Sequence, residues 1–326
     1  MPKNNPRRPF SPDPDQLRLM PEISGNKVNG LGETEVRPPR MVYWAPDPKT
    51  IPHGNLQFYF YGKAAQVPEF AEQSAARREV AKAPLPDVRA TPTELTPDAW
   101  TSALQPFVAE GICDMIGVAD MSDDWVFEGF EIHHSKVIML GGQHDFDAIS
   151  TAPDVTAAVE VMAQYGRAGK AAKQVAAWLR SEGWGAEPVI GPSTGALAMI
   201  PAAMACGFGE LGKHGSIINP EFGASFRLSA VLTDAPFAPT PAREFGIDEF
   251  CQNCRICEDA CPPEALSSQK QIVRGETKWY VDFDKCLPYF NETHGCAICI
   301  AACPWSNPDI GLNLASKLAR RATRKT

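Results

Sequence analysis

The sequence Cys251-Gln-Asn-Cys254-Arg-Ile-Cys257-Glu-Asp-Ala-Cys261-Pro262 places four cysteines at gaps of two, two and three residues. A second stretch repeats this pattern with a longer first gap, as Cys286-x9-Cys296-x2-Cys299-x3-Cys303-Pro304. Eight of the ten cysteines of the chain therefore lie between residues 251 and 303. A disulfide framework would spread its cysteines and join distant loops, whereas clustering of this kind is typical of metal binding.

The spacing of the first stretch matches bacterial ferredoxins, in which three thiolates hold one [4Fe–4S] cluster and the fourth reaches a neighbouring cluster. Applied to both stretches, this crossing rule predicts two clusters. Their expected ligands are Cys251, Cys254, Cys257 and Cys303 for the first, and Cys286, Cys296, Cys299 and Cys261 for the second. Zinc is the alternative, because structural zinc sites also use C-x2-C pairs. Zinc does not explain a third cysteine after another gap of two residues, or the repeated Cys-Pro. We therefore expect two iron–sulfur clusters that form an electron relay.

The composition of the whole chain limits the kinds of protein that it can be. A chain of 326 residues with 44% hydrophobic residues predicts a globular protein of one large or two medium domains. The net charge of −8 argues against nucleic-acid binding. No run of about 18 apolar residues is present, so no membrane span is expected. Arg7-Arg8 precedes prolines and aspartates rather than the apolar stretch of an export signal, so a cytoplasmic location is expected.

Residues 1–97 are expected to form a proline-rich N-terminal arm and a segment that covers a pocket. Residues 1–55 hold 11 of the 30 prolines, which predicts either an extended arm with turns or a disordered tail. The aromatic stretch 55–61 interrupts this pattern. It is expected to pack in a core or, alternatively, to line a substrate pocket.

Residues 98–245 alternate between strand-like and helix-like segments, which predicts an α/β or α+β core. Strands are expected at 112–118, 136–141, 187–191 and 226–233, and helices at 155–181 and 196–206. Gly207-Phe-Gly-Glu-Leu-Gly212 has the form G-x-G-x-x-G, but it follows a helix-like run and so does not indicate a nucleotide site. Cys113 and Cys206 are expected to be small buried residues.

The cysteine-rich module is expected to span residues 246–310, and a basic tail follows at 311–326. The tail carries Lys317, Arg320, Arg321, Arg324 and Lys325. Opposite charge raises encounter rates, so the tail is a candidate docking site for an acidic electron donor such as a ferredoxin or flavodoxin. A solvated, frayed C-terminus is the alternative.

Several stretches ahead of the module resemble the corrinoid-dependent reductive dehalogenases. They are Ala177-Trp-Leu-Arg-Ser-Glu-Gly-Trp184, Gly207-Phe-Gly-Glu-Leu-Gly-Lys-His-Gly215, Pro220-Glu-Phe-Gly223, Arg227 and Thr233-Asp234. The resemblance covers about residues 130–306 and extends more distantly to the epoxyqueuosine reductases. It implies a nitroreductase-like core that binds cobalamin, two [4Fe–4S] clusters that feed it electrons, and removal of halide from a small organic substrate.

The resemblance also implies a catalytic pair. The proton donor of the family is a tyrosine, which corresponds to Tyr165, and its basic partner corresponds to Arg227. A guanidinium stabilises a nearby phenolate, so the phenol gives up its proton more easily. The residues alone leave alternatives open. Tyr165 lies on a predicted inward stripe of Gly and Ala that also suits close helix packing, and Arg227 would suit an ion pair with an acid such as Glu221.

The resemblance implies cofactor contacts at Ser193, Thr194, Gly207, Gly209 and Lys213. Many family members have an asparagine in the loop that reads Gly191-Pro-Ser-Thr-Gly195 here, so Ser193 or Thr194 is expected to supply that hydrogen bond. None of the six histidines lies in an Asp-x-His-x-x-Gly motif, so no lower cobalt ligand is expected.

Two other functions stay open from the sequence. One is a tRNA-modifying reductase of the epoxyqueuosine type, which the net charge of −8 and the presence of Arg227 disfavour. The other is a two-cluster electron carrier without catalysis, which would not need so large a core.

Overall fold

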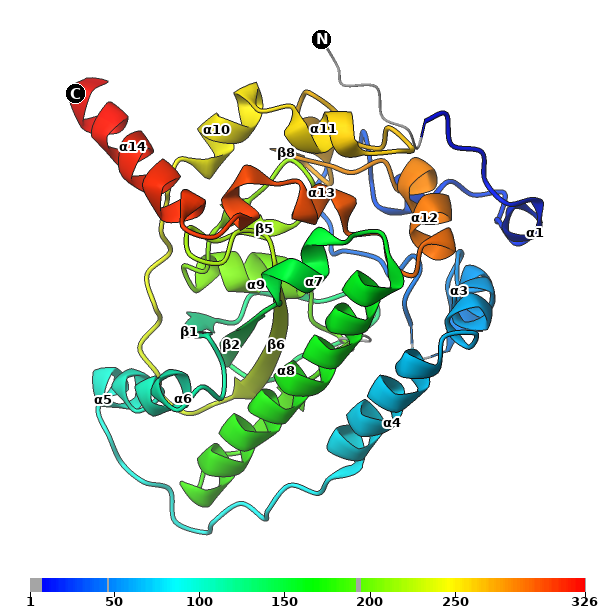
Figure 1. The fold of residues 1–326 in the computed structure, drawn as a ribbon. Helices are drawn as coiled ribbons and strands as arrows, with labels where there is room; N and C mark the ends of the chain where they lie inside the picture. The colour runs from blue at the N-terminus through cyan, green and yellow to red at the C-terminus, as the bar shows by residue number, and fades with distance from the viewer. Residues whose placement is uncertain (1–7, 46, 192–194, 326) are drawn as a thin grey trace.

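The structure, a computed structural model, describes residues 8–45, 47–191 and 195–325 (Figure 1). Its central sheet has four strands in the order β1-β2-β6-β3. They are β1 (Met115–Asp120), β2 (Lys136–Gln143), β6 (Phe226–Thr233) and β3 (Ala186–Val189). Each neighbouring pair is antiparallel, so the described sheet lacks the parallel crossovers of an α/β fold. Of the two predicted classes, the structure therefore has the α+β one.

Helix α8 (Val155–Ser181) has the predicted bounds and crosses one face of the sheet (Figure 1). Its alanines and its larger apolar residues Val175 and Leu179 pack on sheet residues such as Ile138 and Val231. Helix α4 (Pro68–Lys82) packs along α8 as well. The small residues of the stripe therefore serve mainly close packing, whereas the described N-terminal half of α8 lines a cavity with Ala157, Ala158, Val161, Met162 and Tyr165.

The opposite face of the sheet is covered by α9 (Met199–Ala205) and by the short strands β4 (Glu210–Leu211) and β5 (Ile217–Ile218). The helix begins later than predicted because Leu197 pairs with Val126 in an isolated bridge. Cys206 belongs to this core and Cys113 to the core under α8, as expected for small buried residues. Burial raises the pKa of both thiols to about 12.

Strand β1 also begins later than the predicted residue 112. The N–H groups of Ile112 and Cys113 both bond to the carbonyl oxygen of Phe107, in the turn that ends the preceding helix. Ladder pairing with β2 therefore starts only at Met115. The remaining short elements are η1 (Pro48–Thr50), α5 (Pro97–Ser102), α6 (Gln105–Ala109), η2 (Asp123–Trp125) and α7 (Phe146–Ser150).

The cysteine-rich module packs around Trp279 and Trp305. Its elements are α10 (Ile247–Asn253), α11 (Ile256–Ala260), β7 (Gln271–Val273), β8 (Glu276–Lys278), α12 (Phe283–Glu292), α13 (Ile298–Ala301), η3 (Pro304–Ser306) and α14 (Ile310–Lys325). Leu314 and Leu318 of α14 pack against this core, and the rest of the helix projects away from the body (Figure 1). The described tail is therefore a helix, not a frayed end.

The N-terminal arm is ordered over its described residues and lies on the cysteine-rich module. It contains α1 (Pro14–Leu17) and α2 (Gly25–Val28), and α3 (Leu56–Ala64) leads from it into α4. Leu31 pairs with Val273, and the Asn26 amide donates to Asp282 Oδ1 at 2.8 Å. The disordered-tail alternative is therefore wrong for residues 8–45. The division at residues 97, 245 and 310 stays a prediction. None of the described helices is both long and apolar enough to span a membrane.

Candidate active site and cysteine clusters

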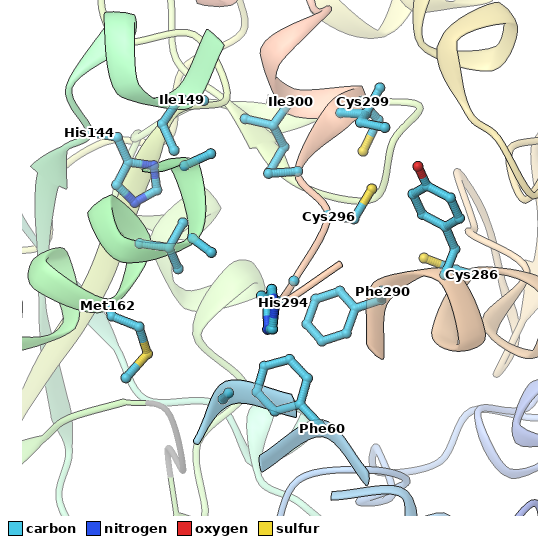
Figure 2. Close-up of a pocket in the computed structure, with 18 of the residues that line it drawn as sticks. Phe60, His144, Ile149, Met162, Cys286, Phe290, His294, Cys296, Cys299 and Ile300 are labelled. Atoms are coloured by element: carbon cyan, nitrogen blue, oxygen red, sulfur yellow. The ribbon is translucent and has the colours of Figure 1, made fainter. Parts of the chain in front are cut away.

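A cavity of about 430 Å³ lies where α3, α4, α7 and α8 face the cysteine-rich module (Figure 2). Most of its wall is apolar, with Trp44, Phe60, Phe70, Ile149, Val161, Met162, Phe290 and Ile300 among its residues. Phe60 and Tyr61 come from the aromatic stretch 55–61, so this stretch lines a pocket in addition to packing on α12. Its described lining contains no aspartate or glutamate.

All four cysteines of the predicted second set line this cavity, namely Cys261, Cys286, Cys296 and Cys299. Figure 2 shows Cys286, Cys296 and Cys299 on the module side, across the cavity from His144 and Met162. The four cysteines of the predicted first set are absent from the described lining. The two sets therefore differ in their access to the cavity.

The thiols of the first set lie close enough to influence one another. Burial raises the pKa of Cys257 to about 12, and neighbouring Cys303, Cys254 and Cys251 raise it further. Burial likewise raises the pKa of Cys303 to about 12, with Cys251 and Cys254 as its cysteine neighbours. Cys303, from the second motif, is therefore within electrostatic range of the first motif, as the crossing rule predicts, and the ligand sets themselves stay a prediction.

The thiols of the second set show the corresponding grouping. Burial raises the pKa of Cys299 well above its usual range, and Cys296, Cys286 and Cys261 add to this effect. Cys261, from the first motif, is therefore a neighbour of the second set. The loop before α13 holds His294, Cys296 and Ala297 at positive φ angles of 54°, 55° and 67°. Non-glycine residues adopt such angles at an energetic cost that is often found at functional sites.

Tyr165 and Arg227 meet in the wall opposite the module. Arg227 Nη1 donates to Tyr165 Oη at 3.2 Å, and the guanidinium carbon lies 4.2 Å from the centre of the phenol ring. Arg227 is delivered by β6 opposite Gly142 of β2, and Tyr165 by α8. A Cβ at Gly191 would come within 2.4 Å of Tyr165 Cε1, so this glycine lets the ring pack against the backbone.

The Arg227 side chain has a second notable feature. Its Nε is buried and has no hydrogen-bond partner among the described residues. Its guanidinium is engaged by Tyr165 rather than by Glu221, the acid that the sequence offered as an alternative partner. The structure therefore brings together the two residues that the resemblance selected.

His144 is a cavity residue that the sequence did not indicate. It follows directly after β2, only 5% of its surface is exposed, and its Nε2 has no described hydrogen-bond partner. Burial, together with the charge of Arg227, lowers the pKa of His144 to about 3. His294 also lines the cavity, with an unpartnered Nδ1 and a pKa that burial lowers. Because β2 pairs with β6, the strand of Arg227, a predicted pairing of these two strands would have placed His144 near the cavity.

The other predicted cofactor contacts do not gather at the cavity. Ser193 and Thr194 lie outside the described residues. Gly207 and Gly209 form the turn before β4, with φ angles of 77° and 155°. A Cβ at Gly209 would lie 1.9 Å from the carbonyl oxygen of Ile218, so this glycine permits a close backbone approach. The placement of both glycines points to a structural role.

Lys213 is buried beside the first cysteine set and does not line the cavity. Its Nζ donates to the carbonyl oxygen of Cys254 at 2.8 Å and forms an ion pair with Glu258. The same ammonium group lies 5.0 Å from the centre of the Trp279 ring. Only 1% of the Lys213 surface is exposed. Its surroundings place it with the first set and away from the cavity, and the expected corrinoid contact stays a prediction.

Comparisons with known proteins agree with the sequence analysis. Residues 250–307 match the family model of the 4Fe-4S dicluster domain, which favours clusters over zinc. Tetrachloroethene reductive dehalogenases of Desulfitobacterium hafniense and Dehalobacter restrictus are 32% identical over 217 residues, covering 62% of this chain and 38% of theirs. An epoxyqueuosine reductase of Staphylococcus aureus is 33% identical over 118 residues, covering 34% of this chain and 30% of its own.

Among solved structures, the catabolic reductive dehalogenase NpRdhA in complex with 3-bromo-4-hydroxybenzoic acid matches with a TM-score of 0.68 and 21% identity. The match covers 76% of this chain and 38% of that chain. The chain therefore spans well under half the length of these relatives. In sequence and in fold it is similar to the reductive dehalogenases, and its C-terminal part resembles a 4Fe-4S dicluster domain.

Proposed function

We propose that the chain is a cobalamin-dependent reductive dehalogenase, which replaces the halogen of a small organic halide with hydrogen. One observation carries this proposal. A single cavity has the four thiols of the second set on one side and the Tyr165–Arg227 pair on the other. Replacement of halide by hydrogen consumes an electron pair and a proton at the same carbon. The cavity supports both requirements in one place.

The donor groups fit the implied cofactors. Each set offers four cysteine thiols, the ligand set of a [4Fe–4S] cluster. The pKa values of these buried thiols are raised, so binding of a cluster would release protons. The mainly apolar cavity would offer contacts to a corrin ring in a nitroreductase-like core, and the unpartnered nitrogens of His144 and Arg227 would be available to its polar side groups. A bound, reduced corrinoid would supply the electrons that break the carbon–halogen bond.

The side chains of the cavity would supply the proton and exclude water. Tyr165 Oη gives its proton to the carbon that loses the halide, and Arg227 Nη1 stabilises the phenolate that remains. His144 does not compete as an acid, because its low pKa keeps the imidazole neutral at neutral pH. The aromatic walls keep bulk water from the reacting carbon.

Electrons would enter through the first set, which lies away from the cavity. Helix α14 packs on the core that contains Cys251 and Cys303, and its exposed half carries Arg320, Arg321 and Arg324. This arrangement supports docking of an acidic ferredoxin or flavodoxin near the first cluster. A cytoplasmic location remains a prediction from the sequence.

The test is halide release by full-length protein loaded with iron, sulfide and cobalamin and reduced by titanium(III) citrate. Tyr165→Phe should lose at least ~100-fold in turnover while it keeps its iron and corrinoid, because the positioned acid is gone. Tyr59→Phe is the matched control, since its hydroxyl bonds to Asp13 outside the cavity lining. Normal turnover by Tyr165→Phe would refute the assigned donor, and a wild-type protein that retains no corrinoid would refute the function.

Arg227→Leu tests the partner of the tyrosine. We expect a loss of turnover and an upward shift of the alkaline limb of the pH–rate profile, because the phenolate loses its counter-charge. Arg227→Lys should restore part of the rate. An unchanged pH–rate profile in Arg227→Leu would contradict the proposed effect of Arg227 on the acidity of Tyr165.

A further inference from the structure

The N-terminal arm brings an arginine to a ligand of the predicted second cluster. The described arm begins beside α11 (Figure 1), where the Arg8 guanidinium bonds to main-chain oxygens. Its Nε and Nη2 donate to the carbonyl oxygen of Cys261 at 3.0 and 2.7 Å, and Nη2 also donates to that of Glu258 at 2.8 Å. Only Cα and Cβ separate the carbonyl group of Cys261 from its sulfur. A positive charge is therefore fixed at the backbone of a cluster ligand.

Other contacts hold this part of the arm on the module without Arg8. The backbone N–H of Asp13 donates to Glu292 Oε1 at 2.7 Å. Phe10 packs edge-on against the Tyr289 ring, with 4.9 Å between the ring centres. Both partners belong to α12, a different helix from the one that Arg8 contacts. Arg8 thus adds a charge beside Cys261 at a place where the arm is already anchored.

The acids near Arg8 leave part of its charge to act on the cluster. Glu264 forms an ion pair with Arg8 Nη1 at 2.7 Å, but 67% of the Glu264 side chain is exposed and only 25% of the Arg8 side chain. Water therefore screens the carboxylate more than the guanidinium. The carboxylate of Glu258 is bound to the buried Lys213. The guanidinium turns Nη1 toward Glu264 and its other two nitrogens toward Cys261.

A charge at this place acts on the reduction of the cluster. A [4Fe–4S] cluster gains one negative charge when it takes up an electron. A nearby cation stabilises this reduced state more than the oxidised state, as do hydrogen bonds to the ligand sulfurs. The N–H group of Ala265 bonds to Cys261 Sγ at 3.4 Å and acts in the same direction. The contacts around Cys261 therefore favour electron uptake.

We propose that Arg8 is a redox-tuning residue, which makes the second cluster easier to reduce and so makes the N-terminal arm a part of the electron path. The assignment of Cys261 to this cluster is the prediction from the cysteine spacing. Onward delivery of the electron to a corrinoid rests on the proposed function, whereas the effect on the cluster does not. Arg8 acts through the cluster and takes no part in bond breaking.

Three substitutions separate the charge of Arg8 from its hydrogen bonds. Arg8→Gln keeps an N–H donor for the Cys261 carbonyl but removes the charge, whereas Arg8→Lys keeps the charge. Glu264→Gln removes the carboxylate that offsets the guanidinium, so its effect should have the opposite sign. Arg18→Gln is the matched control. Arg18 lies in the same arm and carries the same charge, but 74% of its side chain is exposed and its partner is Asp15.

The test is a redox titration of the full-length, cofactor-loaded protein, followed by electron paramagnetic resonance of the reduced clusters. The signal that Cys299→Ala lacks identifies the second cluster. Arg8→Gln should lower the equilibrium constant for its reduction ~3- to 10-fold, or about 30–60 mV for a one-electron couple, because a partly screened charge over several ångström acts on that scale. Arg8→Lys should keep most of the wild-type value, Glu264→Gln should raise it, and Arg18→Gln should equal it. In both Arg8 variants the first cluster should shift less than the second.

Four results would overturn the proposal. They are an unchanged second cluster in Arg8→Gln, an equal fall in Arg8→Lys, an equal fall in Arg18→Gln, and a fall in Glu264→Gln. Halide release separates this proposal from the proposed function. If Arg8→Gln shifts the second cluster but the reduced wild type releases no halide, the proposed function fails and the role of Arg8 stands. If halide is released and Arg8→Gln leaves the second cluster unchanged, the function stands and the role of Arg8 fails.

Discussion

The two cysteine sets share a motif but lie in different surroundings. The second set lines the apolar cavity, together with Tyr165 and Arg227. The first set lies in a core with Trp279 and Trp305, beside the buried Lys213–Glu258 ion pair. One set thus faces the proposed reaction, and the other lies on the side of helix α14. Under the proposed function, this difference would give the electron path between the two sets a direction.

The first set also has the more deeply buried cation beside it. The backbone N–H of Lys213 bonds to Cys251, and this bond opposes the rise that burial causes in the pKa of that thiol. The ammonium group of Lys213 is fixed nearby by the Cys254 carbonyl. Hydrogen bonds and nearby cations stabilise the more negative, reduced state of an iron–sulfur cluster. The second set has a cation of its own, because the Arg8 guanidinium bonds to the Cys261 carbonyl, but 25% of the Arg8 side chain is exposed and only 1% of the Lys213 side chain.

The largest expected effect comes from removing one set at a time. Wild type should hold about eight iron atoms per chain, and Cys299→Ala and Cys257→Ala about four each. Cys299→Ala should abolish halide release with any reductant, because the set at the cavity is lost. Cys257→Ala should lose activity with a flavodoxin but keep activity with titanium(III) citrate, which can reach the second set directly.

Cys113→Ala and Cys206→Ala are the controls for that comparison. Both residues are buried in the apolar cores, away from either set, so their iron content should equal that of wild type. Equal loss of chemically driven activity in Cys257→Ala and Cys299→Ala would contradict the division of labour between the sets.

The next effect is on stability and concerns Lys213. Lys213→Met leaves the buried Glu258 carboxylate with only the exposed Arg255, 3.7 Å away, and breaking a buried pair costs about 3–5 kcal/mol. Lys270→Met is the matched control, because Lys270 lies 5.8 Å from the centre of the same Trp279 ring but is partly exposed with its partner Asp248. It should cost at most about 1 kcal/mol. Urea unfolding measures the free energy of unfolding of each variant. Similar losses in the two variants would show that burial does not strengthen the Lys213–Glu258 ion pair.

The cavity predicts a dependence of stability on pH. Because the folded-state pKa of His144 is about 3, the folded protein binds fewer protons than the unfolded chain between pH 3 and about 6.5. The neutral, buried His144 side chain therefore makes its full contribution to stability above about pH 6.5. This contribution is lost as the pH falls from about 6.5 toward 3. His144→Gln should reduce the loss of stability between pH 7 and pH 5, measured as the urea midpoint. His133→Gln, on an exposed side chain, should leave that loss unchanged, and a His144→Gln slope equal to wild type would contradict the prediction.

The smallest expected effect concerns the entry of electrons. Deletion of residues 317–326 removes the basic half of α14 but retains Leu314, which packs on the first-set core. Reduction of the clusters by a flavodoxin should slow by roughly 10-fold at low salt, since electrostatic steering accelerates association by that order or more. Reduction by dithionite should not change. Equal rates with flavodoxin before and after deletion would assign α14 a structural role only.

Local patterns predicted the fold well where the pattern itself was strong. Helix α8 and strand β6 have the predicted bounds, because a long periodic segment or a short, mostly apolar run largely determines its own structure. The two cysteine groups followed from spacing, which is also local. Strand direction was not predictable in this way, since the same segments can pair in parallel or antiparallel order.

The site was less predictable, because its parts are far apart in the sequence. Tyr165 and Arg227 were selected by resemblance, and nothing in their 62-residue separation indicates a contact. Arg77 and His144 carry no motif, and only folding brings them to one cavity. Lys213 lies within a family-like stretch, yet its buried partner is Glu258, and a buried ion pair cannot be recognised before the chain packs.

The contact between the arm and the module has a consequence for biosynthesis. Arg8 Nε donates to the carbonyl oxygen of Cys261 at 3.0 Å, across 253 positions of sequence. Gln16 and Asn26 bond to residues 288 and 282 at similar separations. The arm leaves the ribosome before the module and has no docking surface until the module has been made, so the two can pack together only after the intervening core has been translated. Because the arm ends beside a ligand of the second set, iron–sulfur assembly machinery must reach Cys261 before the arm closes, or displace it.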